Sequence, residues 1–293
     1  MVWARTKRVV KAVGGRVQHI AATRLIETAD RFCEETPSPA TMVGIFSGEW
    51  SSQLPPPYEN LSGGKVGLFD DSRIHWAAQQ FGDLSGLRVL ELGPLEGGHT
   101  FMLDRMGVAE VLAIEGNRRA FLRCLVTKEL LGMPKARFVC GDFVEFLRQA
   151  LADRAPRWDL CLAVGVLYHQ QDPVALLDLA TRASDRLLLW THYYDRSIVS
   201  GRDDLAVRMK TETRATTAGF PHTLHHYEYQ AALEWDGFCG GLKPWASWLA
   251  RQDILDAIDH LGFEVVGIQF DAPNHPNGPA FCVAARRHAP ATS

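Results

Sequence analysis

From residue 87 onward, short apolar runs alternate with longer amphipathic segments, and this alternation restricts the chain to few folds. Five runs have the length and composition of buried strands: 88–93, 110–116, 136–142, 158–165 and 186–193. Between them lie segments of helical length and periodicity, at 98–107, 118–132, 144–154 and 172–184. Near-continuous apolar strands separated by helices predict an α/β fold, in which a parallel sheet carries helices on both faces.

The segments that flank this alternation follow other patterns. A helix is predicted at 248–262, followed by strands at 263–270 and 280–287 with no helix between them, so these two strands should pair antiparallel at the sheet edge. Residues 195–246 do not alternate and are rich in Trp, Tyr, His and Gly. A segment this long is rarely an idle loop, so we expect a substrate-covering insertion at 195–246.

The N-terminal part is predicted to be a helical extension or lid over residues 1–85, followed by the main domain over 86–293. Residues 1–35 form a basic amphipathic pattern that TPSPA interrupts, and a second helix is expected at 72–82. The basic helix could contact RNA, anionic lipid or an acidic subunit, or be a solvated or subunit-packing helix. A homodimer formed through this helix is one such arrangement.

Composition narrows the class of protein. The net charge of −3 and a charged fraction of 22% do not indicate a nucleic-acid binder. The six cysteines form no CxxC pair, and no apolar stretch approaches the ~18 residues of a membrane span. We therefore expect a soluble protein of a reducing compartment, the cytoplasm.

The turn in VLELGPLEGGHTF follows the first predicted strand and should contact a ligand, because ligands of open α/β sheets bind at the carboxyl ends of the strands. Its glycines, Gly93, Gly97 and Gly98, depart from the dinucleotide pattern G-x-G-x-x-G, with Leu95 at the second position. Glu96 would also place a carboxylate near a pyrophosphate. NAD and FAD are therefore disfavoured, and a nucleoside carrying positive charge is favoured.

Acidic residues stand at three successive strand ends: Glu91, Glu115 and Asp142. An acid at the second strand end can accept hydrogen bonds from both ribose hydroxyls. Asp142 could accept from an adenine amino group, with Phe143 beside the ring. Each acid alone could instead cap a helix, but three in this order favour a nucleoside site.

With these motifs, the run from Arg88 to about Arg287 resembles the class I S-adenosylmethionine-dependent methyltransferases. VLELGPLEGG, AIEGN, VCGDF and DLCLAVGVLYHQQDP resemble the first four motifs of that family. The resemblance implies a Rossmann-like, seven-stranded, mostly parallel sheet that ends in an antiparallel hairpin. It also implies S-adenosylmethionine as cofactor, bound by Glu91, Gly93, Gly97, Glu115, Gly116, Asn117, Asp142, Phe143 and Gly165. Leu95 replaces a usual glycine.

The fourth and fifth strand ends should hold the reacting groups. GVLYH is similar to the same stretch of the tRNA wobble-uridine carboxymethyltransferases and of bacterial small-molecule and glycan methyltransferases, which implies Tyr168 as a site residue. His169 is either a catalytic group or a residue that bonds the backbone. His192, in WTHYYD, is the preferred base.

Acceptor contacts are expected from the segment before the first strand, from the fifth strand end and from the insertion. The candidates are Arg73, Trp76, Tyr193, His225 and Trp245. The histidines of FPHTLHHYE could be written as a metal set with Glu228, but the spacing matches no established metal motif, and we expect no metal.

The sequence therefore predicts methyl transfer to a small metabolite or sugar-containing acceptor, with O-methylation as the main expectation. The aromatic and histidine side chains of the insertion suit the binding of such acceptors. Two alternatives stay open. One is a tRNA-modifying methyl- or carboxymethyltransferase, which the lack of clustered positive charge in the insertion disfavours. The other is a non-catalytic regulator that binds the cofactor.

Overall fold

The structure is a computed structural model that describes residues 32–234, 240–241 and 243–289. The chain divides into two compact units, Met1–Ile45 and Phe46–Ser293. This division lies earlier than the predicted boundary at 85/86, because residues 46–85 belong to the same compact unit as the sheet. Most of the predicted N-terminal helix, and with it the dimer hypothesis, lies outside the described residues.

The described part of the first unit contains helix α3 (Pro39–Gly44), which begins where the sequence predicted only a break. Residues 32–35, predicted as the end of a helix, are not helical. Pro37 disfavours helical geometry in the residue before it. Ser38 caps α3 by accepting from the Thr41 backbone amide, and Pro39 suits the first helical turn because no amide is needed there.

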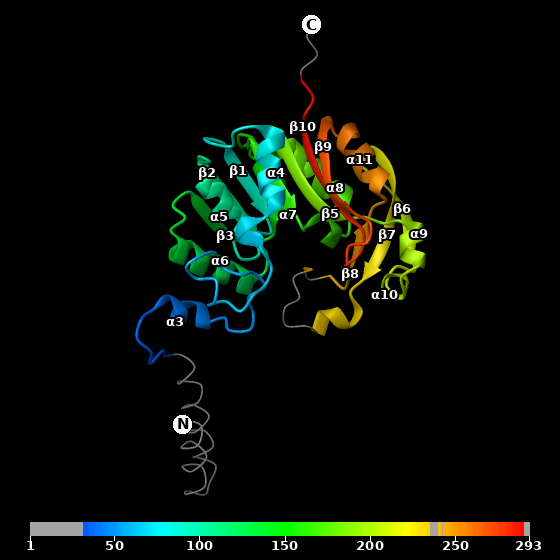
Figure 1. The fold of residues 1–293 in the computed structure, drawn as a ribbon. Helices are drawn as coiled ribbons and strands as arrows, with labels where there is room; N and C mark the ends of the chain where they lie inside the picture. Colours follow the sequence, from blue (N-terminus) through cyan, green and yellow to red (C-terminus); the bar gives the residue numbers. More distant parts are fainter. Residues whose placement is uncertain (1–31, 235–239, 242, 290–293) are drawn as a thin grey trace, which may run out of the picture. The chain divides into compact units, whose positions relative to one another are not determined.

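The second unit is built on a seven-stranded sheet with the order β3-β2-β1-β4-β5-β10-β9 (Figure 1). The first five strands pair in parallel, whereas β10 pairs antiparallel with both β5 and β9. The bounds are β1 (Arg88–Leu92), β2 (Glu110–Glu115), β3 (Ala136–Cys140), β4 (Leu160–Val164), β5 (Arg186–His192), β9 (Phe263–Ala272) and β10 (Ala280–Arg287). The predicted Rossmann-like fold, with its C-terminal antiparallel hairpin, is confirmed.

Helices cover both faces of this sheet, and each face encloses its own apolar core. One core packs α7 (Phe143–Ala152), α8 (Pro173–Ala183) and α11 (Arg251–His260) against the sheet. The other packs α4 (Ser72–Phe81), α5 (Gly98–Arg105) and α6 (Arg118–Leu131). Successive strand residues alternate between the two cores, Leu187 and Leu189 facing one and Leu188 the other. A sheet buried on both sides explains the near-continuous apolar strand sequences.

The insertion contains a second, three-stranded sheet that the sequence analysis did not predict. Its strands β6 (Glu212–Thr217), β7 (Phe220–Glu228) and β8 (Trp245–Trp248) pair antiparallel in that order. Short helices precede it, α9 (Arg196–Ser200) and α10 (Asp203–Ala206), and η3 (Gln230–Glu234) follows β7. Ala218 and Gly219 join β6 to β7 with φ values of 51° and 80°, as a two-residue hairpin requires. Because β8 extends to Trp248, α11 begins at Arg251 and not at the predicted 248.

Candidate functional site

The glycine turn after β1 has the backbone geometry that its sequence indicated. Gly93 and Gly97 have φ values of 67° and 81°, in the left-handed region that favours glycine. A Cβ atom at Gly97 would lie 3.0 Å from Phe138 Cζ, so the turn is tight as well as left-handed. Leu95 also adopts a left-handed conformation, with φ 56°, which costs about 1–2 kcal/mol for a residue with a side chain. The backbone of the glycine turn is therefore strained at Leu95.

Glu115, at the end of β2, supports this strained turn directly. Its carboxylate accepts hydrogen bonds from the backbone amides of Leu95, at 3.0 Å, and Asn117, at 2.8 Å. Burial of Glu115 raises the pKa of its carboxyl group, partly offset by the Asn117 and Leu95 amides. Asn117 in turn caps α6 by accepting from the amides of Arg119 and Ala120. Glu115 thus stands beside the turn, as predicted.

The ends of β2 and β3 lie side by side, which brings Glu115 and Gly116 close to Gly141, the residue before Asp142. The Gly141 amide donates to the Glu115 carbonyl at 3.0 Å. Asp142 is exposed and caps α7, its Oδ1 accepting from the amides of Val144 and Glu145. The capping alternative therefore holds for one carboxylate oxygen, and Oδ2 accepts no hydrogen bond from any described residue. Phe143 follows as the half-buried first residue of α7.

Glu91, in β1, is buried, with 2% of its surface exposed. Thr100 donates to Glu91 Oε2, and His99 Nδ1 lies 3.8 Å from Glu91 Oε1. No hydrogen-bond partner for Oε1 is present among the described residues. Burial raises the pKa of Glu91, and the His99 imidazole and Thr100 hydroxyl oppose that shift. An unpartnered buried carboxylate oxygen beside the glycine turn suits a positively charged ligand group.

A chain of polar contacts leads from Glu91 across the sheet end to β5. His99 Nε2 lies 2.9 Å from Asp71 Oδ2, and Arg73 binds both oxygens of Asp71. The Arg73 guanidinium lies 4.7 Å from the centre of the Trp190 ring, a cation–π contact. His99 and Arg73 hold the pKa of Asp71 well below its usual range, against its burial. Arg73, predicted as a substrate residue, is thus fixed beside the fifth strand.

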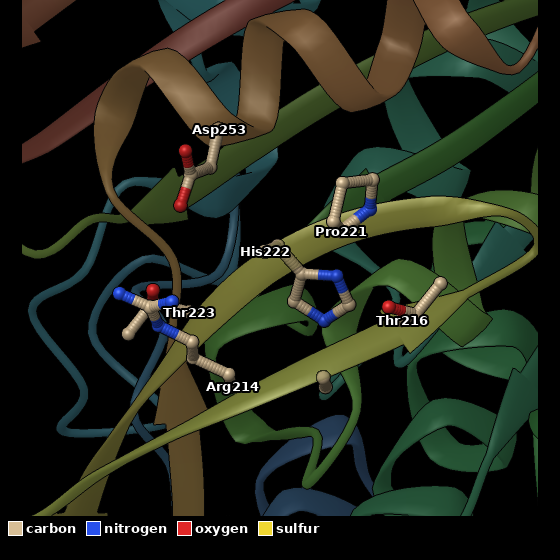
Figure 2. Close-up of a pocket in the computed structure, with 7 residues that line it drawn as sticks. Arg214, Thr216, Pro221, His222, Thr223 and Asp253 are labelled. Carbon is tan, nitrogen blue, oxygen red and sulfur yellow. The ribbon is translucent and has the colours of Figure 1, made fainter.

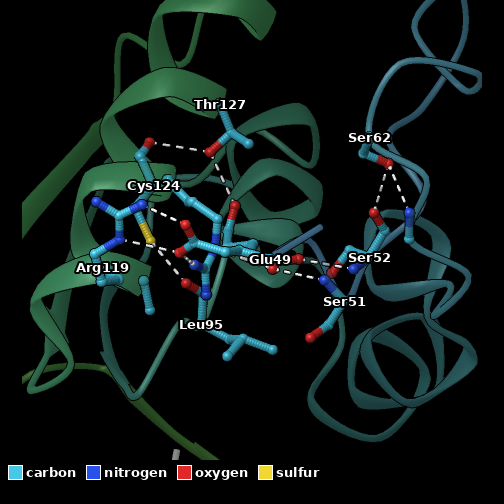
Figure 3. A network of polar contacts seen from close by, with 12 residues as sticks. Glu49, Ser51, Ser52, Ser62, Leu95, Arg119, Cys124 and Thr127 are labelled. Atoms are coloured by element: carbon cyan, nitrogen blue, oxygen red, sulfur yellow. Dashed lines mark hydrogen bonds and ion pairs between the residues drawn. The ribbon is translucent and has the colours of Figure 1, made fainter. Parts of the chain in front are cut away.

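Glu96 belongs to a network of polar contacts that joins the glycine turn to residues 51–52 and to α6; Figure 3 shows this network, with Ser51, Ser52 and Thr127 labelled. Its side chain is fully buried and accepts from the backbone amides of Ser51, at 2.8 Å, and Ser52, at 2.7 Å. Arg123 Nε lies 3.2 Å from Glu96 Oε1, close enough for an ion pair although not aligned as a hydrogen bond. The expected repulsion between Glu96 and a pyrophosphate therefore loses its basis, because the carboxylate is turned away and neutralised. Glu96 instead ties residues 51–52 to the glycine turn.

At the ends of β4 and β5, aromatic rings surround His192. The centre of its ring lies 4.5 Å from that of Tyr168, 5.1 Å from Trp248 and 5.1 Å from His275. Trp190 lies 5.1 Å away on the same strand face. We call His192, Tyr168, Trp190, Trp248 and His275 the aromatic cluster. The Tyr168 hydroxyl lies 3.8 Å from where a Cβ atom on Gly165 would stand, which places the cluster over the end of β4.

The backbone fixes the tautomer of His192. Its Nδ1 lies 2.9 Å from the Gly278 carbonyl oxygen and 3.3 Å from that of Pro279, so Nδ1 carries a proton and donates it. Nε2 is then an acceptor, and no described residue hydrogen-bonds to it. Burial lowers the pKa of His192 to about 4, and His275 adds to the effect. At neutral pH the side chain is therefore uncharged, with Nε2 in its acceptor form.

His169 has a different environment from His192. Its Nδ1 lies 2.7 Å from the Tyr229 hydroxyl, and burial lowers its pKa to about 3, with His192 contributing. Its ring centre lies 4.2 Å from that of Tyr168. His169 thus bonds a side-chain hydroxyl, whereas the structural alternative expected a bond to the backbone.

Four of the predicted acceptor residues lie outside the aromatic cluster. Tyr193 faces the opposite side of the sheet from His192, where it packs on Phe281, because neighbouring strand residues point to opposite faces. Trp76 is buried against Phe270. His225 stacks on Tyr194 and pairs with Glu212, and Trp245 stacks on His226. Their assignment as acceptor contacts is not supported by this placement.

Three members of the aromatic cluster were not among the predicted site residues: Trp190, Trp248 and His275. Trp190 could have been found, because it precedes His192 by two positions and therefore shares its face of the strand. Trp248 was assigned to the start of a helix, and it lies instead at the end of β8. His275 lies in the turn between β9 and β10, and no local pattern in DAPNHPNGP indicated that it would approach β5.

Stability should fall in mild acid because of the two buried imidazoles. An unfolded histidine has a pKa of about 6.5, whereas His192 and His169 have pKa values of about 4 and about 3. As the pH falls below 6.5, the unfolded chain binds protons that the folded chain does not. Each imidazole should make the free energy of unfolding about 1–2 kcal/mol lower at pH 5 than at pH 7.5.

Urea unfolding at the two pH values would measure this loss. His192→Asn should reduce it by roughly one imidazole's share, whereas His260→Gln, at the exposed end of α11, should not change it. Equal losses in the wild-type protein and His192→Asn would contradict the prediction.

Among the described residues, no three His, Cys, Asp or Glu side chains are arranged to hold a metal ion. The described helices also include none that is long and apolar enough to cross a membrane.

Comparison with known proteins places the fold. No protein-family model matches the chain, and no curated protein matches it. The N-terminal domain of EvdMO1, crystallised in the presence of SAH and D-fucose, is 23% identical, with a TM-score of 0.61 over 90% of this chain and 97% of that one. Full-length EvdMO1 is 21% identical, and the match covers 46% of its chain with a TM-score of 0.54. An S-adenosylmethionine-dependent methyltransferase from Mesorhizobium loti is 16% identical, with a TM-score of 0.50 over 75% of this chain and all of that one. The fold is therefore that of the class I methyltransferases.

Proposed function

We propose that the protein transfers the methyl group of S-adenosylmethionine to a hydroxyl group of a small or sugar-containing acceptor. The observation that carries this proposal is His192, a neutral imidazole whose Nδ1–H is held by backbone carbonyls and whose Nε2 accepts no hydrogen bond from a described residue. It lies in an aromatic enclosure over Gly165, at the sheet end where the methyltransferase fold binds its reactants. O-methylation of a hydroxyl needs such a base.

The residues around the glycine turn fit the cofactor. Glu91 Oε1, which has no hydrogen-bond partner among the described residues, would face the cofactor's ammonium or sulfonium charge, and Glu115 would accept from ribose hydroxyls. Asp142 Oδ2, which accepts no hydrogen bond from a described residue, would accept from an adenine amino group. When bound, S-adenosylmethionine would supply the methyl group on an electrophilic carbon.

His192 would remove the acceptor's hydroxyl proton at Nε2 as the oxygen forms its bond to the methyl carbon and the bond between that carbon and sulfur breaks, which would leave SAH as product. The aromatic faces of Trp248 and Trp190 would stabilise the resulting imidazolium, since cations are attracted to ring faces. The same rings exclude water and hold an acceptor in line, and such alignment can lower a barrier by about 7–11 kcal/mol. Arg73, on Trp190, would bind an acceptor oxygen.

The proposal also draws support from one similar protein. The EvdMO1 domain was crystallised with SAH and D-fucose together, and its match covers nearly all of this chain. We extend both ligand classes to this chain as part of the proposal, with the sugar as a guide to acceptor class and not to acceptor identity.

Calorimetric titration with S-adenosylmethionine, SAH and NAD tests the first half of the proposal. We expect micromolar binding of the first two and none of NAD. Formation of SAH from S-adenosylmethionine, measured with a panel of sugars, glycosides, small hydroxylated compounds and bulk tRNA as acceptors, tests the second half. Turnover with tRNA alone would replace the proposed acceptor class, and failure to bind S-adenosylmethionine or SAH would end the proposal.

Glu115→Ala should weaken SAH binding about 100-fold, because the variant loses the carboxylate that would accept hydrogen bonds from two ribose hydroxyls, as well as the support for Leu95. Calorimetry would measure this loss. Glu110→Ala, at the other and exposed end of β2, is the matched control and should leave affinity unchanged. Similar affinities in Glu115→Ala and the wild-type protein would remove Glu115 from the cofactor site.

A further inference from the structure

An open groove of about 460 Å³ lies between α11 and the β6–β7 hairpin, and it shares no residue with the aromatic cluster. Figure 2 shows Asp253 on α11, across from the hairpin that carries the other labelled residues. The volume of the groove falls within the range of ~300–1,000 Å³ that is typical of small-molecule binding sites. We call it the hairpin groove, and it is lined by Arg214, Thr216, Pro221, His222, Thr223 and Asp253.

Four polar side chains of the hairpin groove form few contacts with the rest of the described chain. Arg214 and Asp253 form no ion pair with any described residue, and the hydroxyls of Thr216 and Thr223 form no hydrogen bond with one. Other polar residues of the same hairpin are paired, in the contacts Glu212–His225, Thr213–His226 and Thr217–Asp172. The groove therefore brings together polar side chains that are available to a ligand, two of them, Arg214 and Thr216, exposed.

His222 supplies the strongest indication of a ligand. It is 6% exposed, and its Nδ1 lies 3.0 Å from the Phe220 carbonyl oxygen, so Nδ1 donates and Nε2 must accept. Nε2 is buried and has no hydrogen-bond partner among the described residues. Leaving a buried acceptor unsatisfied costs about 1–3 kcal/mol, a cost that a hydrogen-bond donor bound in the groove would remove.

We propose that the hairpin groove binds a sugar ring. Arg214 and Asp253 carry opposite charges, so the groove as a whole favours a neutral ligand over an anion or a cation. His222 Nε2 and the Asp253 carboxylate accept hydrogen bonds, Arg214 donates them, and the two threonine hydroxyls do both. Neighbouring hydroxyls of a sugar also donate and accept, so they match this mixed set, and the Pro221 ring offers an apolar surface for a sugar C–H face.

The position of the groove suggests what the sugar would be part of. The groove lies on the insertion, whose Tyr227 stacks on Trp248 of the aromatic cluster at 5.0 Å between ring centres. We assign the groove to a second sugar unit of a glycosylated acceptor whose other end is methylated. This role rests on the proposed methyl transfer, whereas sugar binding itself does not.

Saturation-transfer difference NMR on the full chain, without cofactor and with D-fucose as probe, tests the proposal. His222→Phe keeps an aromatic ring but removes both ring nitrogens, including the acceptor Nε2. Asp253→Asn removes the negative charge of the carboxylate acceptor. Each should raise the dissociation constant for the sugar at least about tenfold. His226→Phe, on the same strand but outside the groove, is the control and should bind as the wild-type protein does.

Three results would overturn the proposal: no saturation transfer to D-fucose, equal binding by His222→Phe and the wild-type protein, or loss of binding in His192→Ala, which would place the sugar in the aromatic cluster. Tighter binding of sulfate or L-alanine than of the sugar would reject the ligand class. If thermal unfolding shows that His222→Phe does not fold, the same test is made with Arg214→Gln and Thr216→Val, whose positions are exposed. Because cofactor is absent, sugar binding can fail or succeed independently of S-adenosylmethionine binding.

Discussion

Arg123→Ala is expected to lower the free energy of unfolding by about 3–5 kcal/mol, the largest stability effect that the structure predicts. Arg123 lies between Glu96, at 3.2 Å, and Glu49, at 3.1 Å, and Glu96 has no exposed surface. Removing the guanidinium leaves a buried carboxylate without its cation, and breaking a buried ion pair in this way typically costs that much. Chemical denaturation, followed by circular dichroism, would measure the change.

The same helix and turn provide the controls for this prediction. Arg118→Ala, on the exposed face of the same helix, should change stability by less than about 0.5 kcal/mol. The double variant Glu96→Gln with Arg123→Met removes both charges and should be more stable than Arg123→Ala alone. A double variant as unstable as Arg123→Ala would show that packing, and not the uncompensated charge, causes the loss.

His192→Ala is expected to lower kcat about 10²- to 10⁴-fold, the range that a general base contributes, with SAH affinity nearly unchanged. The affinity should survive because the residues assigned to the cofactor, except Gly165 after β4, lie at the ends of β1, β2 and β3, whereas His192 ends β5. Rates of SAH formation with an acceptor from the screen, combined with calorimetry, separate the two effects.

Tyrosine variants extend the test of the aromatic cluster. Tyr168→Phe should lower kcat, and Tyr193→Phe, on the opposite face of the sheet, is the matched control that should not. A His192→Ala enzyme with wild-type kcat would exclude His192 as the base, and loss of SAH binding in that variant would move it to the cofactor site.

The fold was predictable largely because its sheet is buried on both faces. In β5, for example, Leu187, Leu188 and Leu189 are apolar and buried in succession, so the strand sequence differs sharply from the amphipathic helices on either side. The β6–β7 hairpin carries little such signal, since its first strand is mostly exposed. Its two-residue turn at Ala218 and Gly219 lacks the Asn-Gly or Asp-Gly pair that usually marks a hairpin.

The candidate site was predictable where it depends on strand ends and not where it depends on distant contacts. Glu91, Glu115 and His192 lie at or beside strand ends, as their positions in the motifs indicated. Glu96 was misjudged because its partners, Ser51 and Ser52, are far away in the sequence and bond through backbone amides that no side-chain pattern reveals. Trp248 and His275 reach the cluster only through the folding of the insertion and the β9–β10 turn.

The main-chain anchor of His192 also affects how this site can change during evolution. In many enzymes a carboxylate side chain orients the catalytic histidine, and a single substitution can then disable it. Here the carbonyls of Gly278 and Pro279 do so for His192, the proposed base, and no second side chain is required. Gly278 itself has little freedom to change, because its φ is 115° and a Cβ atom there would lie 2.6 Å from the Trp248 ring. Under the proposed function, substitutions at the other surrounding rings would change which acceptor is bound while the imidazole keeps its tautomer.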